Sequence, residues 1–300
     1  MYHRPVLADE VRSLFPAPRR VVDGTLGDGG HSALFLDAGA TVLGIDRDPG
    51  ARARAAERLA GRPIEIRSGN VFDPVNLQAI RAFGPDGILL DLGVSSRQLD
   101  DDDLGFSFRP GTRLDMRLSG SGPSAADLLA SATEEELAGW LRDYGDEPRA
   151  RRLARVIARR RARAPFETSD DLVNAIREAL GPTSGAADFA RLFQALRIAV
   201  NDELPALERG LPELRDALVG GGTLAVISYH SGEDRIVKHA FREWSRACVC
   251  PPELYRCECR GRPLGRTLTR RPVTPSPVEV ERNPRARSAK LRAFQVADAG

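Results

Sequence analysis

The chain has 300 residues, of which 42% are hydrophobic and 29% charged, and its formal net charge is +2 at pH 7. This composition is typical of a globular protein with enough length to bury a core in one large domain or two. No stretch reaches the roughly 18 uninterrupted apolar residues that span a bilayer, and the N-terminus lacks the pattern of a signal peptide. We therefore expect a cytoplasmic protein with no membrane partner.

The first hundred residues alternate apolar runs with helical patterns. Residues 21–35, VVDGTLGDGGHSALF, predict a strand, a tight glycine loop and the start of a helix. Residues 40–46 predict a second strand, followed by a helix over 49–60, and further apolar runs lie within IEIRSGNVFD (64–73) and PDGILLDLGVSS (85–96). Each run stops at a polar residue, as buried parallel strands do. The alternation predicts a doubly wound α/β sheet.

The pattern changes between residues 106 and 204, where we find amphipathic helices and no good strand. One of them begins at Thr133, which has Glu136 at capping-box spacing. The sheet pattern then resumes with a helix ending at residues 220–222, a strand within TLAVISYHS (223–231), a helix over 233–247 and a final strand near 288–296. We predict an α/β domain of residues 1–105 and 205–300, interrupted by an all-helical insertion domain of residues 106–204 that recognises the substrate.

The glycine loop narrows the choice of nucleotide. No G-x-x-x-x-G-K-[ST] sequence is present, so a P-loop is excluded. Gly27 and Gly29 fit the dinucleotide fingerprint, but Ser32 stands where its third glycine belongs. The carboxylate of Asp23 would repel a pyrophosphate and attract a methionine ammonium, whereas Asp46 could accept hydrogen bonds from the ribose of either cofactor. The sequence favours S-adenosylmethionine, with a nicotinamide-dependent dehydrogenase and a catalytically inert fold as alternatives.

Two clusters have more than one interpretation. All four cysteines lie in CVCPPELYRCECR, as Cys248, Cys250, Cys257 and Cys259. Their C-x-C spacing is tighter than the usual C-x-x-C zinc knuckle, so we favour reduced thiols and no metal, with zinc as the open alternative. Eight arginines lie between residues 149 and 163; they suit contact with phosphates or form a solvated helix face.

Several stretches together resemble one family closely, the bacterial 16S ribosomal RNA cytosine-N4 methyltransferases, also called MraW or RsmH. They are HRPVLADEV, DGTLGDGGHS, GIDRDP, ILLDLGVSSRQLD, GFSF, LDMR, FQALRIAVNDEL, ISYHSGEDRIVK and NPRARSAKLR, and they run from residue 3 to residue 292. The resemblance implies a class I Rossmann-like methyltransferase fold and S-adenosyl-L-methionine as the methyl donor. It also implies a cytidine of 16S rRNA, in the P-site region of the small ribosomal subunit, as the acceptor.

By motif position, the resemblance assigns cofactor contacts to Gly29, Gly30, His31, Asp46, Asp91 and Gln98. The family has a further contact in the loop after the third strand, which falls on Val71 or Phe72; we favour Phe72, whose ring could lie against the adenine. The sequence departs from the family at Gly232, where leucine is usual, and the cysteine cluster occurs in only some members. DLGVSS also replaces the Asp/Ser-Pro-Pro-aromatic signature of other amino-methyltransferases, so their catalytic residues cannot be transferred.

The exocyclic amine of cytosine is a poor nucleophile that must be oriented, and attack by N4 needs no cysteine adduct. Our catalytic candidates are Asp91 and Ser95. The acceptor pocket is predicted to be lined by Asp115, Asn201, Glu203, His230 and Ser231, each of which could instead serve a structural network. The base must leave its stack. A non-catalytic rRNA-binding assembly factor remains an alternative, and the oligomeric state is open between monomer and homodimer.

Overall fold

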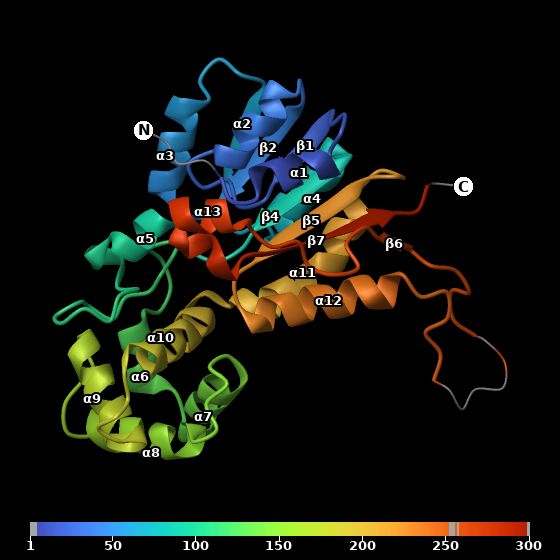
Figure 1. The fold of residues 1–300 in the computed structure, drawn as a ribbon. Coiled ribbons are helices and arrows are strands. Elements are labelled where there is room, and N and C mark those ends of the chain that lie inside the picture. Colours follow the sequence, from blue (N-terminus) through green and yellow to red (C-terminus); the bar gives the residue numbers. More distant parts are fainter. Residues whose placement is uncertain (1–4, 252–255, 257, 299–300) are drawn as a thin grey trace. The chain divides into compact units, whose positions relative to one another are not determined.

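A computed structural model describes residues 5–251, 256 and 258–298 of the chain (Figure 1). The chain divides into two compact units. One is formed by Met1–Gly93 together with Leu204–Gly300, and the other by Val94–Glu203. The first unit is therefore discontinuous in sequence, whereas the second is a single uninterrupted segment.

The first unit is built on a seven-stranded sheet in the order β3-β2-β1-β4-β5-β7-β6. Its strands are β1 (Arg20–Asp23), β2 (Thr41–Asp46), β3 (Ile64–Ser68), β4 (Gly87–Asp91), β5 (Thr223–Ser228), β6 (Gly265–Thr267) and β7 (Lys290–Val296). The first five are parallel, and β7 runs antiparallel to both β5 and β6. The strand order reverses between β1 and β4, which is where open α/β sheets bind their ligands. The predicted class I Rossmann-like fold is confirmed.

Helices cover both faces of this sheet. They are α1 (Ala8–Leu14), α2 (Gly30–Asp37), α3 (Pro49–Arg58), α4 (Pro74–Phe83), α11 (Glu203–Ala217), α12 (Ser231–Trp244) and α13 (Pro277–Arg282). One core joins α1 and α2 to one face, and the other joins α4, α11 and α12 to the opposite face. Successive strand residues such as Val21 and Val22 enter different cores and are both fully buried. This two-sided burial explains the continuous apolar runs of β1, β2, β4 and β5. The prediction of a buried strand is wrong for β3, which lies at the edge of the sheet and has no fully buried residue.

The second unit is helical. It contains α5 (Ser96–Asp100), the 3₁₀ helix η1 (Asp102–Leu104), α6 (Ala125–Ser131), α7 (Glu134–Asp143), α8 (Ala150–Arg161), α9 (Ser169–Leu180) and α10 (Ala186–Asn201). The predicted capping box at the start of α7 is confirmed, because Glu136 N–H donates to the Thr133 hydroxyl and the Glu136 carboxylate accepts from Thr133 N–H. Within the described part of the chain, no helix is long and apolar enough to cross a membrane.

Several element boundaries differ from the predictions. The helix expected over 233–247 spans Ser231–Trp244, and the helix expected over 189–204 is divided because Asp202 adopts a left-handed conformation with φ 50° between α10 and α11. No pattern in the sequence predicted α1, β6 or α13, which are short and lie in stretches rich in polar residues or proline.

Candidate active site

The loop between β1 and α2 is shaped by left-handed glycines. Gly27 and Gly29 have φ values of 52° and 76°, a conformation that side chains with a Cβ rarely adopt. A Cβ on Gly29 would also lie 2.7 Å from Leu59 Cδ1. Gly29 is the N-cap of α2, so no side chain caps the first turn of this helix. The N-terminus of α2 is therefore suited to receive an anionic group such as a carboxylate.

Asp46, at the end of β2, holds this loop in place. Its Oδ2 accepts a hydrogen bond from Gly27 N–H at 2.7 Å, and its Oδ1 accepts one from Asp48 N–H at 2.8 Å. Burial raises the pKa of this carboxyl, while the amides of Asp48 and Gly27 act in the opposite direction. Each carboxylate oxygen has a second lone pair, so Asp46 can still accept hydrogen bonds from a ligand.

Asp23, at the end of β1, is 1% exposed. The Ser32 hydroxyl donates to its Oδ2 at 2.7 Å, and the Thr25 amide lies 3.4 Å from its Oδ1. Burial raises the pKa of the Asp23 carboxyl, against the lowering effect of Ser32 and His31. Ser32 therefore has a specific partner, which explains the hydroxyl at the position that the dinucleotide fingerprint gives to glycine.

Asp91, at the end of β4, lies beside two other polar side chains of the first unit. The Tyr229 hydroxyl donates to Asp91 Oδ1 at 2.8 Å, and His31 Nε2 lies 3.7 Å from Asp91 Oδ2. Burial, followed by the charge of Asp91, raises the pKa of Tyr229 well above its ordinary value. Among the described residues, His31 is 5% exposed and neither of its ring nitrogens has a hydrogen-bond partner. Buried polar atoms are rarely left in this state, so the geometry points to a ligand or water at this position.

Tyr229 is a site residue that the sequence reasoning missed, as is Thr25, whose hydroxyl accepts from the Asp91 amide at 2.6 Å. Tyr229 does stand in the quoted stretch ISYHSGEDRIVK. No spacing rule, however, connects it with Asp91, which is 138 residues away in the chain.

Phe72 and Val71, the two candidates after β3, have different environments. Val71 is 4% exposed, and its Cγ2 would lie 2.9 Å from a Cβ on Gly24. Phe72 is only partly buried, and its ring packs so closely on Gly210 of α11 that a Cβ there would overlap it. Of the two side chains, Phe72 is the one with surface left to offer a ligand.

Two candidates that follow β4 belong to the second unit. Ser95 is the N-cap of α5, where its hydroxyl accepts from Gln98 N–H at 3.2 Å and its own N–H donates to Gln98 Oε1 at 2.8 Å. This reciprocal pair satisfies amide donors at the start of the helix. Both side chains therefore have a local structural role.

The other candidates in the second unit are also held by neighbours within it. Asp115 pairs with Arg117, whose hydrogen bond is the main cause of the lowered pKa of that carboxyl. Asn201 accepts from the Leu118 amide and donates to the Met116 and Arg197 carbonyls. Glu203 is paired by both oxygens with Arg197. These contacts fix the segment around residues 115–118 against α10.

His230 and Ser231 stand at the start of α12 in the first unit. His230 is the N-cap, and its Nε2 lies 3.2 Å from Oε1 of the buried Glu233. The other oxygen of Glu233 accepts from the Tyr229 amide at 2.8 Å. Glu233 thereby links Tyr229, whose hydroxyl contacts Asp91, to His230, the N-cap of α12.

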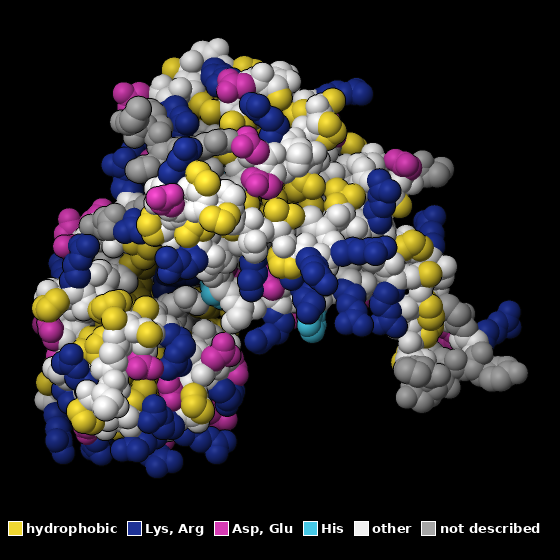
Figure 2. Space-filling view, in the orientation of Figure 1, with side chains coloured by type: hydrophobic (Ala, Val, Ile, Leu, Met, Phe, Trp, Pro, Cys, Tyr) yellow, Lys and Arg dark blue, Asp and Glu magenta, His cyan; other side chains and the backbone are white. Residues whose placement is uncertain are grey.

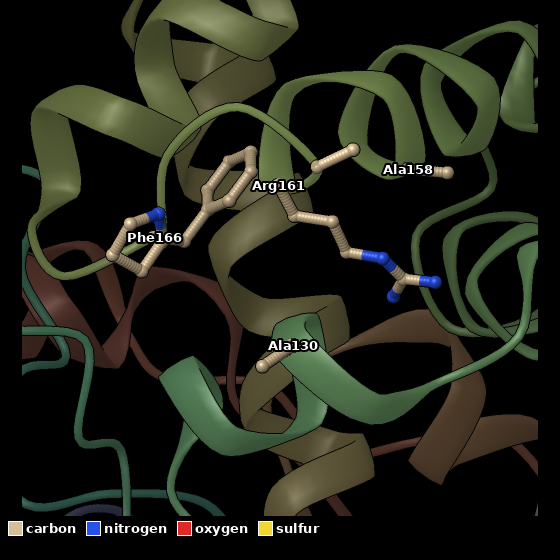
Figure 3. A pocket seen from close by; sticks show the side chains of 6 residues that line it. Ala130, Ala158, Arg161 and Phe166 are labelled. Atoms are coloured by element: carbon tan, nitrogen blue, oxygen red, sulfur yellow. The ribbon is translucent and has the colours of Figure 1, made fainter.

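A cavity of about 390 Å³ lies within the second unit, lined by Ala130, Ala158, Arg161, Ala162, Pro165 and Phe166 (Figure 3). Arg161 donates to the Leu129 and Ala132 carbonyls at 2.8 and 2.6 Å, so its guanidinium has a local structural role. The lining contains no nucleophile and no carboxylate. The polar cluster around Asp91 is therefore the better candidate for chemistry.

The arginines of residues 149–163 fall into two groups. Arg155 pairs with Glu134, Arg159 and Arg160 pair with Glu178, and Arg149 and Arg161 bind backbone carbonyls. The remaining three, Arg151, Arg152 and Arg163, are exposed. Figure 2 shows basic side chains gathered on the surface of α8. The paired members fit a solvated helix face, and the exposed members leave contact with phosphates as a prediction.

Comparison with known proteins identifies the family. The model of the MraW methylase family matches residues 1–297. The ribosomal RNA small subunit methyltransferase H of Gemmatimonas aurantiaca is 55% identical over 99% of this chain and 96% of its own length. The protein of the same name from Rubrobacter xylanophilus is 49% identical over the same shares of the two chains. The chain belongs to the MraW methylase family, and its methyl donor is S-adenosyl-L-methionine.

Proposed function

We propose that this protein transfers a methyl group from S-adenosyl-L-methionine to the exocyclic N4 amine of one cytidine in the P-site region of 16S rRNA. The coarser part of this statement, methylation of small-subunit rRNA, is supported by the family match and by the shared name of the relatives. The choice of N4 and of the P-site region rests on the motifs that resemble the cytosine-N4 methyltransferases.

The observation that carries the proposal is the polar cluster at the carboxyl ends of β1 and β4. It consists of the buried carboxylate of Asp23, the half-buried carboxylate of Asp91 and the buried imidazole of His31. Neither ring nitrogen of His31 has a hydrogen-bond partner among the described residues. When bound, the cofactor supplies an electrophilic methyl group on a cationic sulfonium, next to a methionine ammonium. Negative side chains beside a glycine loop suit such a cation and disfavour a pyrophosphate.

Each cofactor residue has a role that its contacts support. Asp46 accepts hydrogen bonds from the ribose hydroxyls, in addition to those from the loop amides that it already holds. The uncapped first turn of α2, entered through Gly29 and Gly30, receives the methionine carboxylate. Phe72 presents the exposed part of its ring to the adenine. Gln98 is proposed as a further cofactor contact because of its position in the family motif.

Asp91 is our candidate for the acceptor amine. Its Oδ1 is held by the Tyr229 hydroxyl, which leaves Oδ2 to accept an N–H of the amine and to orient the nitrogen lone pair. Orientation of this kind supplies much of the rate enhancement when the nucleophile is weak. Ser95 is our second candidate for contact with the acceptor base. Its hydroxyl oxygen accepts from Gln98 N–H in the capping box, and its hydroxyl hydrogen can be donated to the base.

The helical insertion is proposed to recognise the rRNA. Residues 106–204 contain Asp115, Asn201 and Glu203, which shape the segment on which the acceptor pocket is proposed to lie, while His230 and Ser231 contribute from α12. The target cytosine reaches the methyl group as a flipped or single-stranded base. We leave the oligomeric state open between monomer and homodimer.

The test is transfer of labelled methyl groups to purified, unmodified small ribosomal subunits, followed by nucleoside mass spectrometry. We expect N4-methylcytidine from a single position. Asp91→Asn keeps an acceptor for Tyr229 but removes the charge, and should lower kcat by about 10²-fold or more while cofactor affinity changes less. Asp48→Asn, which preserves the N-cap of α3, should behave as wild type. Methylation of another atom, or full turnover by the Asp91→Asn variant, would contradict the proposal.

A further inference from the structure

Residues 245–264 connect the end of α12 to the start of β6 within the first unit. The two ends of this segment are joined by the Leu264 amide, which donates to the Trp244 carbonyl at 2.8 Å. Arg260 adds hydrogen bonds to the Glu243 carboxylate at 2.7 Å and to the Glu243 carbonyl at 2.6 Å. None of the described residues between 245 and 263 is buried. Hydrophobic packing therefore does not hold this segment in its conformation.

Three cysteine side chains converge within the segment. The Sγ atoms of Cys248, Cys250 and Cys259 all lie within 4.8 Å of one another, and those of Cys248 and Cys259 are 3.8 Å apart. In tetrahedral zinc–thiolate sites the Zn–S distance of about 2.3 Å places neighbouring sulfurs about 3.8 Å apart. The backbone of Val249 donates to Cys259 Sγ at 3.3 Å, the kind of hydrogen bond that orients a metal-bound thiolate.

We infer that Cys248, Cys250 and Cys259 bind a divalent zinc ion that stabilises the conformation of the described residues around it, 245–251 and 258–264. Thiolate ligands in tetrahedral arrangement select zinc over the hard cations calcium and magnesium. A segment without an apolar core gains its order from such a metal, as small zinc modules do. Cys257 lies outside the described residues and is not included in this ligand set.

The proximity of the three sulfurs favours zinc binding over reduced thiols, the two interpretations that the sequence left open. Spacing alone favoured reduced thiols, because C-x-C pairs are tighter than the usual zinc knuckle. In the fold, however, the Sγ of Cys259 lies within 4.8 Å of the Sγ atoms of both Cys248 and Cys250. The inference is independent of the reaction, since attack by the N4 amine requires no cysteine.

The first experiment measures metal in the full-length chain, purified without chelators from cells grown with added zinc. We expect one equivalent of zinc per chain. Exchange with cobalt should produce thiolate-to-cobalt charge-transfer bands and the intense visible bands of tetrahedral Co²⁺. Because all four cysteines of the chain lie between residues 248 and 259, these charge-transfer bands can arise only from this segment.

The matched variants are Cys248→Ser, Cys250→Ser, Cys259→Ser and, as a control in the same segment, Glu258→Gln. Each serine variant should lose the zinc equivalent and the cobalt bands, whereas Glu258→Gln should retain both. Removing zinc from the wild type should accelerate tryptic cleavage at Arg256 or Arg260 about tenfold or more, with the melting temperature of the remainder unchanged. Absence of zinc and of cobalt bands in the wild type, or retention of the metal by all three serine variants, would overturn the inference.

Discussion

At the scale of single residues, Asp23 has opposite effects on stability and on ligand binding. Burial raises the pKa of its carboxyl, so the folded protein is less stable with the charge than without it. The same charge, at the end of β1, attracts a cationic cofactor. The charge of Asp23 therefore lowers the stability of the folded protein and strengthens the binding of the cofactor.

We therefore expect Asp23→Asn to melt higher than the wild type at neutral pH without cofactor. Because the folded pKa of Asp23 lies above its unfolded value, the destabilising charge is present above the folded pKa. The advantage of the variant should therefore shrink as pH falls through that value. Affinity for S-adenosylmethionine should fall about tenfold or more, since the methionine ammonium loses a buried counter-charge. Thermal denaturation across pH and isothermal titration calorimetry measure the two effects.

Ser32→Ala provides the matched control for Asp23→Asn. It keeps the carboxylate but removes the hydroxyl that donates to it at 2.7 Å. The variant should melt below the wild type at neutral pH, because a buried acceptor is left unsatisfied. If Asp23→Asn also melts below the wild type, burial is not the dominant influence on this carboxyl.

The sequence located some of these residues and not others for a physical reason. Asp23, Asp46 and Asp91 could be found because each ends an apolar run, and the carboxyl ends of parallel strands share one edge of the sheet. Tyr229 could not, because its bond to Asp91 depends on β4 and β5 being neighbours across an insertion of more than a hundred residues. The orphaned nitrogens of His31 likewise depend on burial that only the fold determines.

At the scale of secondary-structure elements, the contact between α11 and the loop after β3 depends on Gly210. A Cβ at this position would overlap the Phe72 ring, so Gly210→Ala must displace the ring or the helix. We expect a loss of about 1–3 kcal/mol in the free energy of unfolding and weaker cofactor binding. Chemical denaturation and calorimetry would measure them, and adding Phe72→Leu should recover part of the stability.

Gly139→Ala is the control for a helical glycine with space around it. Gly139 lies inside α7, and a Cβ there would meet no atom within 4 Å. Alanine should therefore stabilise the protein by about 0.5–1 kcal/mol through its higher helix propensity. Equal effects of the two substitutions would show that the contact with Phe72 is not responsible for the loss at Gly210.

The arginines of α8 give a second prediction at this scale. Arg151 and Arg152 are exposed, whereas Arg159 and Arg160 are paired with Glu178. Changing Arg151 and Arg152 together to alanine should weaken rRNA binding and reduce the slope of log K against log salt by about 1–2, with stability unchanged. Filter binding over a salt series measures the affinity and the slope. An unchanged slope would show that Arg151 and Arg152 do not contact phosphates and that they form a solvated helix face.

Helix boundaries were predicted less well than helix positions. The amphipathic pattern correctly located α7, α8 and α9, but it continued through residue 202, where the backbone turns left-handed. Asp tolerates that conformation better than most residues, yet nothing in the local pattern required it there. The break results from the passage of the chain from the second unit to the first, which is a tertiary requirement.

At the scale of the whole molecule, the two units have separate cores. All members of the helical core lie between Phe106 and Leu196, and both cores that flank the sheet are formed by residues outside 94–203. Units with separate cores need not unfold in one cooperative step. Of the proposed cofactor residues, all except Gln98 belong to the first unit.

We expect calorimetry to resolve two unfolding transitions, of which S-adenosylmethionine shifts chiefly one. At 100 times its Kd, a ligand stabilises the state that binds it by about 2.7 kcal/mol. Hydrogen exchange should assign the shifted transition to β1, β2 and β4, and the other to α7, α8 and α9. A single transition that moves as a whole would show that the units unfold cooperatively.

The placement of β7 also determines when the sheet can be completed during synthesis. This strand lies between β5 and β6, yet it is made from residues 290–296, which are synthesised after every other strand of the sheet. The helical unit is contiguous and ends at residue 203, so it can fold on the nascent chain while the sheet still lacks three strands. Until residues 290–296 have been made, β5 presents an unpaired edge, the kind of surface on which aggregation begins. A premature stop before residue 290 would remove this strand and leave that edge exposed.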